Sequence, residues 1–568
     1  MAAPAGPAGA EQTTGAAAPS YVHGAGAVPL LGETIGQNLD RTTAAFPDQD
    51  ALVSVHQGIR QTYAEFHAAV EEVARGLLAL GVEPGERVGI WSPNNAEWAT
   101  LQYATAKVGA ILVNVNPAYR TSELAYALGQ SGVSTLVLAR GFRQADYVAM
   151  VAAVAGETPA LARLVVLGSD PPAGAMGWDD LRAAGAGVAP DALRAREALL
   201  QFDDPINIQY TSGTTGFPKG ATLSHHNILN NGLFIGEGCG YSEADRVCIP
   251  VPLYHCFGMV LGNLACTTHG AAMVYPAEGF DPEATLAAVQ AERCTSLYGV
   301  PTMFIAELEH PRFAEFRLDS LRTGIMAGSP CPVEVMKKVQ SEMHMDEVTI
   351  CYGMTETSPV SFQTGRDDPV DKRVATVGRV HPHVEVKVVD PDSGRVLPRG
   401  EPGELCTRGY VVMLGYWDDR QATDAAIDEA RWMHTGDLAT LDGDGYANIV
   451  GRIKDMVIRG GENVYPREVE EFLYQHPAVS DVQVVGVPDA RYGEELCAWV
   501  RLREGHEVDG EELRAWCTGR IASFKIPRYW RFVDEFPMTV TGKVQKFKMR
   551  ETSIAELGLG EAAGTRTA

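Results

Sequence analysis

Apolar and polar positions from about residue 28 to residue 200 switch between helical and strand spacing. A helix is predicted by the gaps of four and three between Phe66, Val70, Val73, Leu77 and Leu80. Residues 87–91 then predict a buried strand, and further short apolar runs follow at 110–115, 135–138 and 164–167. Strands separated by helices favour an α/β fold with layers around a mainly parallel sheet.

The pattern changes after about residue 380. Residues 384–388 alternate in period two, and 404–407 and 446–450 are further short strand candidates, with a tight Asp/Gly turn at 442–445 before the last of them. This predicts an antiparallel β region. From residue 451 onward, helix candidates at 468–473 and 511–521 flank a strand candidate at 482–487, which predicts a separate small domain.

The length of 568 residues exceeds what one compact core holds, so at least two domains are expected. We expect a disordered Ala/Gly/Pro-rich leader at 1–27, a large domain at 28–451, a small domain at 452–551 and a flexible tail at 552–568. The leader lacks the early Lys or Arg of a signal peptide, and none of the ten cysteines forms a CxxC pair. Reduced core thiols and a cytoplasmic location are the expectation.

Charge argues against several classes of partner. The chain has 72 Asp and Glu against 47 Lys and Arg, a net charge of −25. Such a surface repels nucleic-acid phosphates, so no nucleic-acid partner is expected. No apolar run approaches the roughly 20 residues that span a bilayer, so no transmembrane segment is predicted.

A loop rich in glycine and threonine follows a strand candidate at 206–210 and is the most informative segment. Its hydroxyls, glycine N–H groups and one lysine suit phosphate binding, although it does not match the Walker A pattern. An ordinary surface turn is the alternative. The candidate ligands are Thr211, Ser212, Gly213, Thr214, Thr215, Gly216 and Lys219.

This loop resembles the phosphate loop of the adenylate-forming superfamily, which includes acyl- and aryl-CoA synthetases. The sequence at 254–282 is most similar to the medium-chain fatty acyl-CoA synthetase branch. Further segments resemble motifs of the family in the order it requires, from about residue 30 to 550. These segments are Tyr254-His255-Cys256-Phe257-Gly258, Ala327-Gly328-Ser329-Pro330, Tyr352-Gly353-Met354-Thr355-Glu356, Thr435-Gly436-Asp437, residues 451–455 with 460–466, and Thr541-Gly542-Lys543-Val544.

The resemblance implies an ATP site. Glu356 would bind Mg²⁺ and Thr355 the α-phosphate, while Asp437 and Arg452 would contact the ribose. Adenine would lie between Tyr352 and the segment Gly328, Ser329 and Pro330. By themselves, Glu356 could be a solvated surface residue and Tyr352 a core aromatic.

The resemblance also implies two catalytic steps. Lys543, just after a flexible glycine, would contact the carboxylate and α-phosphate during adenylation, although a basic run such as 543–550 is more often solvated. Lys454 would be the hinge about which the small domain turns. Gly460 and Gly461 would then let the pantetheine of CoA approach, with a plain turn as the alternative.

The acyl tail would lie near His255, Phe257, residues 234–240 and residues 298–303, where apolar groups suit an aliphatic or aryl chain. His255 is equally well interpreted as a core histidine. Amino-acid adenylation domains carry an Asp near this point, and residues 254–261 contain none.

The sequence therefore predicts an ATP-dependent fatty acyl-CoA synthetase that acts on a medium- or long-chain acid through acyl-AMP, as a monomer or homodimer. The expected fold is a large domain of layered α/β subdomains plus a small β-barrel, and a small mobile α+β lid. An aryl-CoA ligase or a carrier-protein-loading ligase is the alternative, and a non-catalytic nucleotide-binding relative is a third possibility. That relative would have lost Glu356, Asp437, Arg452 or Lys543, and all four are present.

Overall fold

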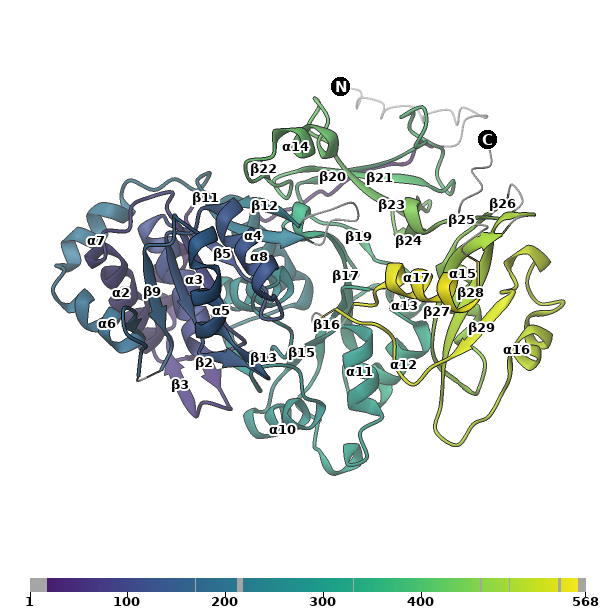
Figure 1. Cartoon of the computed structure of the whole chain (residues 1–568), viewed down its shortest axis with the longest axis horizontal. Helices are drawn as coiled ribbons and strands as arrows, with labels where there is room; N and C mark the ends of the chain where they lie inside the picture. Colours follow the sequence, from purple (N-terminus) through teal and green to yellow (C-terminus); the bar gives the residue numbers. More distant parts are fainter. Residues whose placement is uncertain are drawn as a thin grey trace, which may run out of the picture.

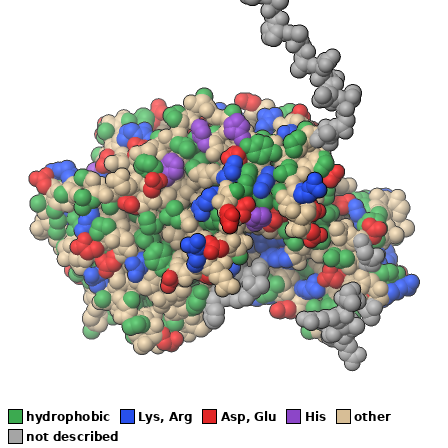
Figure 2. Space-filling model, turned by 90° about the horizontal axis from the view of Figure 1, so that it is seen from above, with side chains coloured by type: hydrophobic (Ala, Val, Ile, Leu, Met, Phe, Trp, Pro, Cys, Tyr) green, Lys and Arg blue, Asp and Glu red, His purple; other side chains and the backbone are tan. Residues whose placement is uncertain are grey.

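The computed structural model describes residues 18–168, 170–211, 218–329, 331–459, 462–489, 491–539 and 543–559. A large body, purple to green in Figure 1, carries a smaller yellow-green domain beside it. Seen from above, the small domain is a separate lobe with a hollow between it and the large body (Figure 2). None of the described helices is long and apolar enough to cross a membrane.

The first large sheet has eight strands, which the sequence pattern predicted in part. It is parallel from β10 to β11 and antiparallel at β12 and β22, and helices connect β4 to β5, β5 to β6 and β6 to β9. Its order is β10 (Met176–Gly177), β9 (Arg163–Val166), β6 (Thr135–Leu138), β4 (Arg87–Trp91), β5 (Ile111–Asn114), β11 (Pro205–Thr211), β12 (Lys219–Ser224) and β22 (Gly415–Tyr416).

The second large sheet has nine strands and is parallel from β17 to β2, with antiparallel strands at both edges. Its order is β19 (Arg379–Val380), β18 (Val360–Gln363), β17 (Glu347–Gly353), β16 (Thr323–Ala327), β15 (Ser296–Gly299), β13 (Arg246–Cys248), β14 (Ala272–Tyr275), β2 (Asp50–Ser54) and β3 (Ile59–Thr62). A short hairpin of β7 (Gly141–Phe142) and β8 (Ala145–Asp146) lies apart from both large sheets.

Helices fill the space between and around these sheets. The predicted helix is α2 (Tyr63–Ala79), which a capping box of Thr62 and Glu65 begins. Helices α3 (Ala96–Val108) and α8 (His225–Cys239) each contact both sheets, and α3 is buried at every position except Glu97. The others are α1 (Ile35–Ala45), α4 (Thr121–Ser131), α5 (Tyr147–Val154), α6 (Trp178–Ala186), α7 (Pro190–Glu197), η2 (Phe257–Leu264, a π-helix), α9 (Ala265–His269), α10 (Pro282–Glu292), α11 (Pro301–Leu308), α12 (Val333–Glu342), α13 (Val370–Ala375) and α14 (Arg420–Ala426).

The predicted antiparallel region is a five-stranded sheet in the place of the expected small barrel. Its order is β1 (Tyr21–His23), β20 (Val384–Val389), β21 (Gly403–Gly409), β23 (Met433–Leu441) and β24 (Ala447–Arg452), and no pairing between β1 and β24 closes it among the described residues. The expectation of a disordered leader up to residue 27 is wrong for residues 18–27. Tyr21–His23 pairs with Glu385–Lys387, an order that the Ala/Gly/Pro composition does not reveal.

The small domain forms a last sheet of β26 (Glu462–Val464), β25 (Val457–Arg459), β28 (Gly493–Leu502) and β27 (Val479–Asp489), and β29 (Tyr529–Phe532) pairs with β28. Its helices are α15 (Pro466–Leu473), α16 (Gly510–Cys517) and α17 (Lys546–Glu556). Because α17 runs to Glu556 and buries Met549 and Ser553, the flexible tail expected from residue 552 begins too early. All ten cysteines are free and buried, as predicted.

Candidate active site

The candidate site begins where parallel strands of both large sheets end. Strand β11 ends at Thr211, β16 at Ala327 and β17 at Gly353, and the carboxyl ends of parallel strands are where α/β proteins bind ligands. A 3₁₀ turn, Thr355–Thr357, follows β17 and carries two of the predicted residues. Gly353 is required there, because a Cβ atom would lie 1.7 Å from the carbonyl oxygen of Pro359.

Glu356, the predicted Mg²⁺ ligand, is only 5% exposed. Its Oε1 atom accepts a hydrogen bond from the Thr211 hydroxyl (3.3 Å) and one from the Tyr416 hydroxyl (2.8 Å). The ammonium of Lys219 lies 5.1 Å from the centre of the Tyr416 ring, and Lys219 pairs with Thr211 across β11 and β12. At one described end of the predicted phosphate loop Thr211 contacts Glu356 directly, and at the other Lys219 lies beside Tyr416, which also contacts Glu356.

Tyr416 is a residue that the sequence analysis missed. It lies in β22, an edge strand that pairs with β12 of the first sheet although it comes about 190 residues later in the chain. Burial, and then contact with the Glu356 carboxylate, raise the pKa of Tyr416, so its hydroxyl stays a donor. The preceding Gly415 has a φ of 154°, and a Cβ atom there would lie 2.9 Å from Thr423, but neither signal is visible without the strand pairing.

The predicted ribose residues form a second cluster. Asp437 and Arg452 are paired residues of β23 and β24, with 3.2 Å between Arg452 Nε and Asp437 Oδ1. The Tyr352 hydroxyl donates to Asp437 Oδ2 at 2.6 Å. Burial raises the pKa of Asp437, while Arg452 and Tyr352 act to lower it. Tyr352 therefore has a polar contact at the site as well as packing against Phe362.

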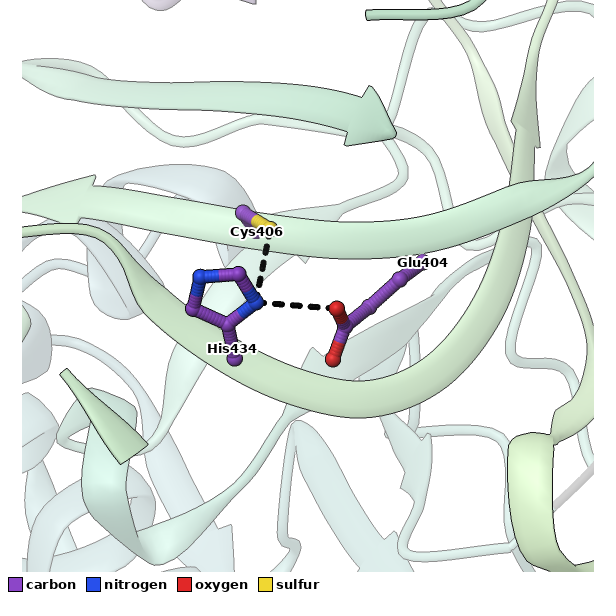
Figure 3. Close-up of side chains that lie close together, drawn as sticks. All are labelled: Glu404, Cys406 and His434. Carbon is purple, nitrogen blue, oxygen red and sulfur yellow. Dashed lines mark hydrogen bonds and ion pairs between the residues drawn. The ribbon is translucent and has the colours of Figure 1, made fainter. Parts of the chain in front are cut away.

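Glu404 supports the loop that carries Asp437, and the sequence analysis missed it too. Glu404 Oε2 accepts from His434 Nδ1 (2.8 Å), and Oε1 accepts from the backbone N–H of Gly436 (3.2 Å). Cys406 Sγ lies 3.6 Å from the same histidine nitrogen (Figure 3). These three side chains are types that bind metals. Here His434 Nδ1 is hydrogen-bonded to Glu404 Oε2, and Glu404 Oε1 accepts from Gly436, so these ligand atoms already have partners. Glu404 and His434 therefore stabilise the position of Gly436 and of the neighbouring Asp437.

Lys543 lies between the two domains, next to both clusters. Burial is the main factor that lowers the pKa of Lys543, and the negative charges of Glu356 and Asp437 act to raise it. Its Cε atom lies 3.6 Å from the point where Gly328 would carry a Cβ. Gly328 has a φ of 91°, which favours glycine. The structure thus brings Lys543 together with Gly328, Glu356 and Asp437.

His255 also lies near Lys543. Burial, with a contribution from the charge of Lys543, lowers the pKa of His255 to about 3, so the ring is neutral at pH 7. Its Nδ1 atom accepts from the backbone N–H of Phe257 at 3.1 Å. Phe257 packs against Tyr298 from the predicted acyl segment at 298–303, with 5.7 Å between ring centres. Cys256 Sγ lies 3.8 Å from the hydroxyl of Thr355.

Some predicted residues are not tested by this geometry. Ser212, Gly213, Thr214, Thr215, Gly216, Pro330, Gly460 and Gly461 lie outside the described residues. Ser329 is partly exposed beside Gly328. Lys454 lies in a short 3₁₀ turn directly after β24, and burial together with Arg452 lowers its pKa. Its role as a hinge stays a prediction.

Comparison with protein families settles the identity of the fold. The model described as AMP-binding enzyme matches residues 39–417, and the model described as AMP-binding enzyme C-terminal domain matches residues 468–543. The chain belongs to the AMP-binding enzyme family. The two matched segments fall in the large and the small domain of the structure.

Individual members of the AMP-binding enzyme family match almost the whole chain. YngI of Bacillus subtilis strain 168, which is named as an acyl-CoA synthetase, is 50% identical over 94% of this chain and 99% of its own. Medium-chain acyl-CoA ligase ACSF2, mitochondrial, of Danio rerio is 47% identical over 95% of this chain and 91% of its own.

Solved structures of AMP-binding enzymes share this architecture. The anthranilate CoA ligase AuaEII, solved with anthranoyl-AMP, superposes with a TM-score of 0.83 at 27% identity and covers 94% of this chain and 99% of its own. ATP-bound MatB from Rhodopseudomonas palustris gives a TM-score of 0.79 at 30% identity, over 91% of this chain and 99% of its own. The predicted family and the predicted α/β fold with a large N-terminal domain and a C-terminal domain are therefore confirmed.

Proposed function

We propose that this chain is an ATP-dependent fatty acyl-CoA synthetase that activates a medium- or long-chain acid. It would convert the acid and ATP into acyl-AMP and pyrophosphate, and then use CoA to release acyl-CoA and AMP. The observation that carries the proposal is the position of Lys543 between the domains, beside Glu356, Asp437 and Gly328. Relatives of nearly full length that are named as acyl-CoA synthetase or medium-chain acyl-CoA ligase support the choice of reaction.

Adenylation concentrates negative charge, so the site needs cations and donors placed locally in an acidic chain. Glu356 fits a Mg²⁺ ligand because it is a buried carboxylate. Among the described residues, the hydroxyls of Thr211 and Tyr416 both donate to its Oε1 atom, so Oε2 is available for the metal. When bound, Mg²⁺ would offset phosphate charge. Lys219 and Thr355 would add a charge and a hydroxyl donor for the phosphates.

Asp437, Tyr352 and Arg452 would hold the nucleoside. Asp437 can accept from the ribose hydroxyls because Arg452 and Tyr352 stabilise its charged form. Lys543 would bind the carboxylate of the acid and the α-phosphate, and so bring the two reacting groups together. The neutral His255 would border the acyl chain without adding a charge beside it.

The second step needs space for a thiol where Lys543 lies. The small domain would turn about Lys454 and remove Lys543, and Gly460 and Gly461 would let the pantetheine of CoA approach the acyl-AMP. A cytoplasmic location and a monomeric or homodimeric state stay predictions. The zebrafish relative is named as mitochondrial.

The test measures release of AMP and pyrophosphate with ATP, Mg²⁺ and a series of acids from butyrate to stearate plus aryl acids, with and without CoA. CoA-dependent AMP release with a mid-length fatty acid is the expected result. Preference for an aryl acid would favour the aryl-CoA ligase instead. Pyrophosphate release that CoA does not convert into thioester would favour a carrier-protein-loading ligase.

A further inference from the structure

Helix α15 of the small domain presents two charged residues to the large domain. Its apolar residues Val469 and Leu473 pack in the core of the small domain. Arg467 and Glu471, one turn apart on the same helix, form an ion pair with 3.9 Å between Arg467 Nε and Glu471 Oε1. Arg467 Nη1 donates to the carbonyl oxygen of Ile449 in β24 at 2.6 Å.

Glu471 lies near the start of another helix. Burial raises the pKa of the Glu471 carboxyl, while the charge of Arg467 and the backbone N–H of Val333, the first residue of α12, act to lower it. An N–H group at this position has no acceptor within its own helix, and the helix dipole favours an anion there. Burial raises the pKa of the Cys331 thiol, just before α12, and the charges of Arg467 and Glu471 also act on it, so both charged groups lie within electrostatic range of this segment.

The location of this contact links it to the candidate site. Helix α12 follows directly on residues 327–331, which include Gly328 beside Lys543. In Figure 1, α12 lies on the side of the large body that faces the small domain. A second contact joins the domains nearby: Ser480 donates to Glu309 Oε1 at 3.2 Å, and Arg501 lies 3.9 Å from Glu309 Oε2.

The Arg467 and Glu471 contacts differ from the Glu309 contact in burial. The side chains of Arg467 and Glu471 are 17% and 30% exposed, whereas that of Glu309 is 50% exposed. Exposed ion pairs contribute little, because water and salt screen them, and hydrogen bonds to a charged group in a partly buried place contribute more. The α15 contacts are therefore the stronger candidates for holding the two domains together.

We infer that Arg467 and Glu471 are positioning residues that hold the small domain in the orientation in which Lys543 lies beside Glu356 and Gly328. This inference rests on the proposed function, in which that orientation serves adenylation. The thioester step needs a different orientation, so both contacts must break when α15 leaves α12. The pair thus favours the first half-reaction over the second.

The test compares Arg467→Met and Glu471→Ala with Glu468→Ala as a matched control. Glu468 lies on the same helix but pairs with Lys525 inside the small domain. Two rates are measured separately: pyrophosphate release with acid and ATP without CoA, and thioester formation from supplied acyl-AMP and CoA. Each test variant should lose about tenfold in the first rate and nothing in the second, and the control should lose neither. Equal loss of both rates, or no loss, would overturn the inference.

A second readout does not depend on the reaction. Hydrogen exchange of the segment that contains the Val333 amide should be faster in Glu471→Ala than in Glu468→Ala, because the amide loses the carboxylate near it. Unchanged exchange would overturn the inference even in an active enzyme. If the wild-type protein forms no acyl-AMP with any acid, the proposed function fails, while this exchange experiment still decides whether α15 binds α12.

Discussion

Replacing Tyr416 with phenylalanine tests whether the hydroxyl that contacts Glu356 matters for the nucleotide step. The substitution keeps the ring near Lys219 and removes only the donor that lies 2.8 Å from Glu356 Oε1. A hydrogen bond to a charged group contributes about 1.5–3 kcal/mol. Because the Thr211 hydroxyl still donates to the same oxygen, we expect the lower end, about 1.5 kcal/mol, or about a tenfold loss of rate.

The assay for Tyr416→Phe is kcat/KM for ATP in pyrophosphate release at saturating Mg²⁺. Tyr446→Phe is the matched control, since its hydroxyl donates to Asp368 at 2.6 Å and contacts none of the predicted site residues. The control should change stability but not kcat/KM. If Tyr416→Phe keeps the wild-type kcat/KM, the view that this hydroxyl orients Glu356 is wrong, whatever happens to the melting temperature.

Three further substitutions probe other parts of the structure. Lys543→Ala should abolish acyl-AMP formation yet leave CoA attack on supplied acyl-AMP nearly intact; equal loss of both steps would contradict the assigned role. Glu404→Gln should raise KM for ATP about tenfold with a smaller change in kcat, because the loop that carries Asp437 loses its charged acceptor; an unchanged KM would show that the loop needs no such brace. Burial raises the pKa of Glu307 well above its ordinary value, and both its carboxylate oxygens are buried without a hydrogen-bond partner among the described residues. The folded state thus binds a proton that the unfolded state releases, so Glu307 lowers stability increasingly as the pH rises above the unfolded pKa. Glu307→Met should raise the free energy of unfolding by about 1–3 kcal/mol near neutral pH and by less in acid, and the melting temperature should rise with it. A gain in stability that does not depend on pH would contradict this.

The sequence predicted those parts of the fold that local pattern determines. Helix α2 follows from apolar spacing and begins at a capping box, and strand β4 follows from one apolar run. Strand β1 was missed, because Tyr21–His23 is ordered only by pairing with β20, more than 300 residues away in the chain. Helix α16 ends at Cys517, four residues before the predicted end at Ile521, where Gly519 has a φ of 76°.

The candidate site likewise contains some residues that the sequence predicted and others that only the structure reveals. Asp437 and Arg452 were predicted from a family resemblance, and the structure places them on adjacent strands. Tyr416 and Glu404 were not predicted, because each acts on a residue from a different strand or turn. The approach of Glu471 to Val333 joins two domains and involves a backbone N–H, so no side-chain pattern could have indicated it.

The burial of Lys543 suggests why substrate binding and domain orientation are coupled. Moving its ammonium out of water disfavours the charged form, and two carboxylates, Glu356 and Asp437, offset this only in part, since the pKa of Lys543 remains lowered. The phosphates of ATP and the carboxylate of the acid would add negative charge at the same place. They therefore favour the charged lysine in this orientation, and by thermodynamic reciprocity the orientation favours their binding. Once pyrophosphate leaves, part of that charge would be lost and the balance would move back toward a solvated lysine. The contacts of Arg467 and Glu471, together with the weaker contacts of Glu309, would then oppose release of the small domain for the thioester step.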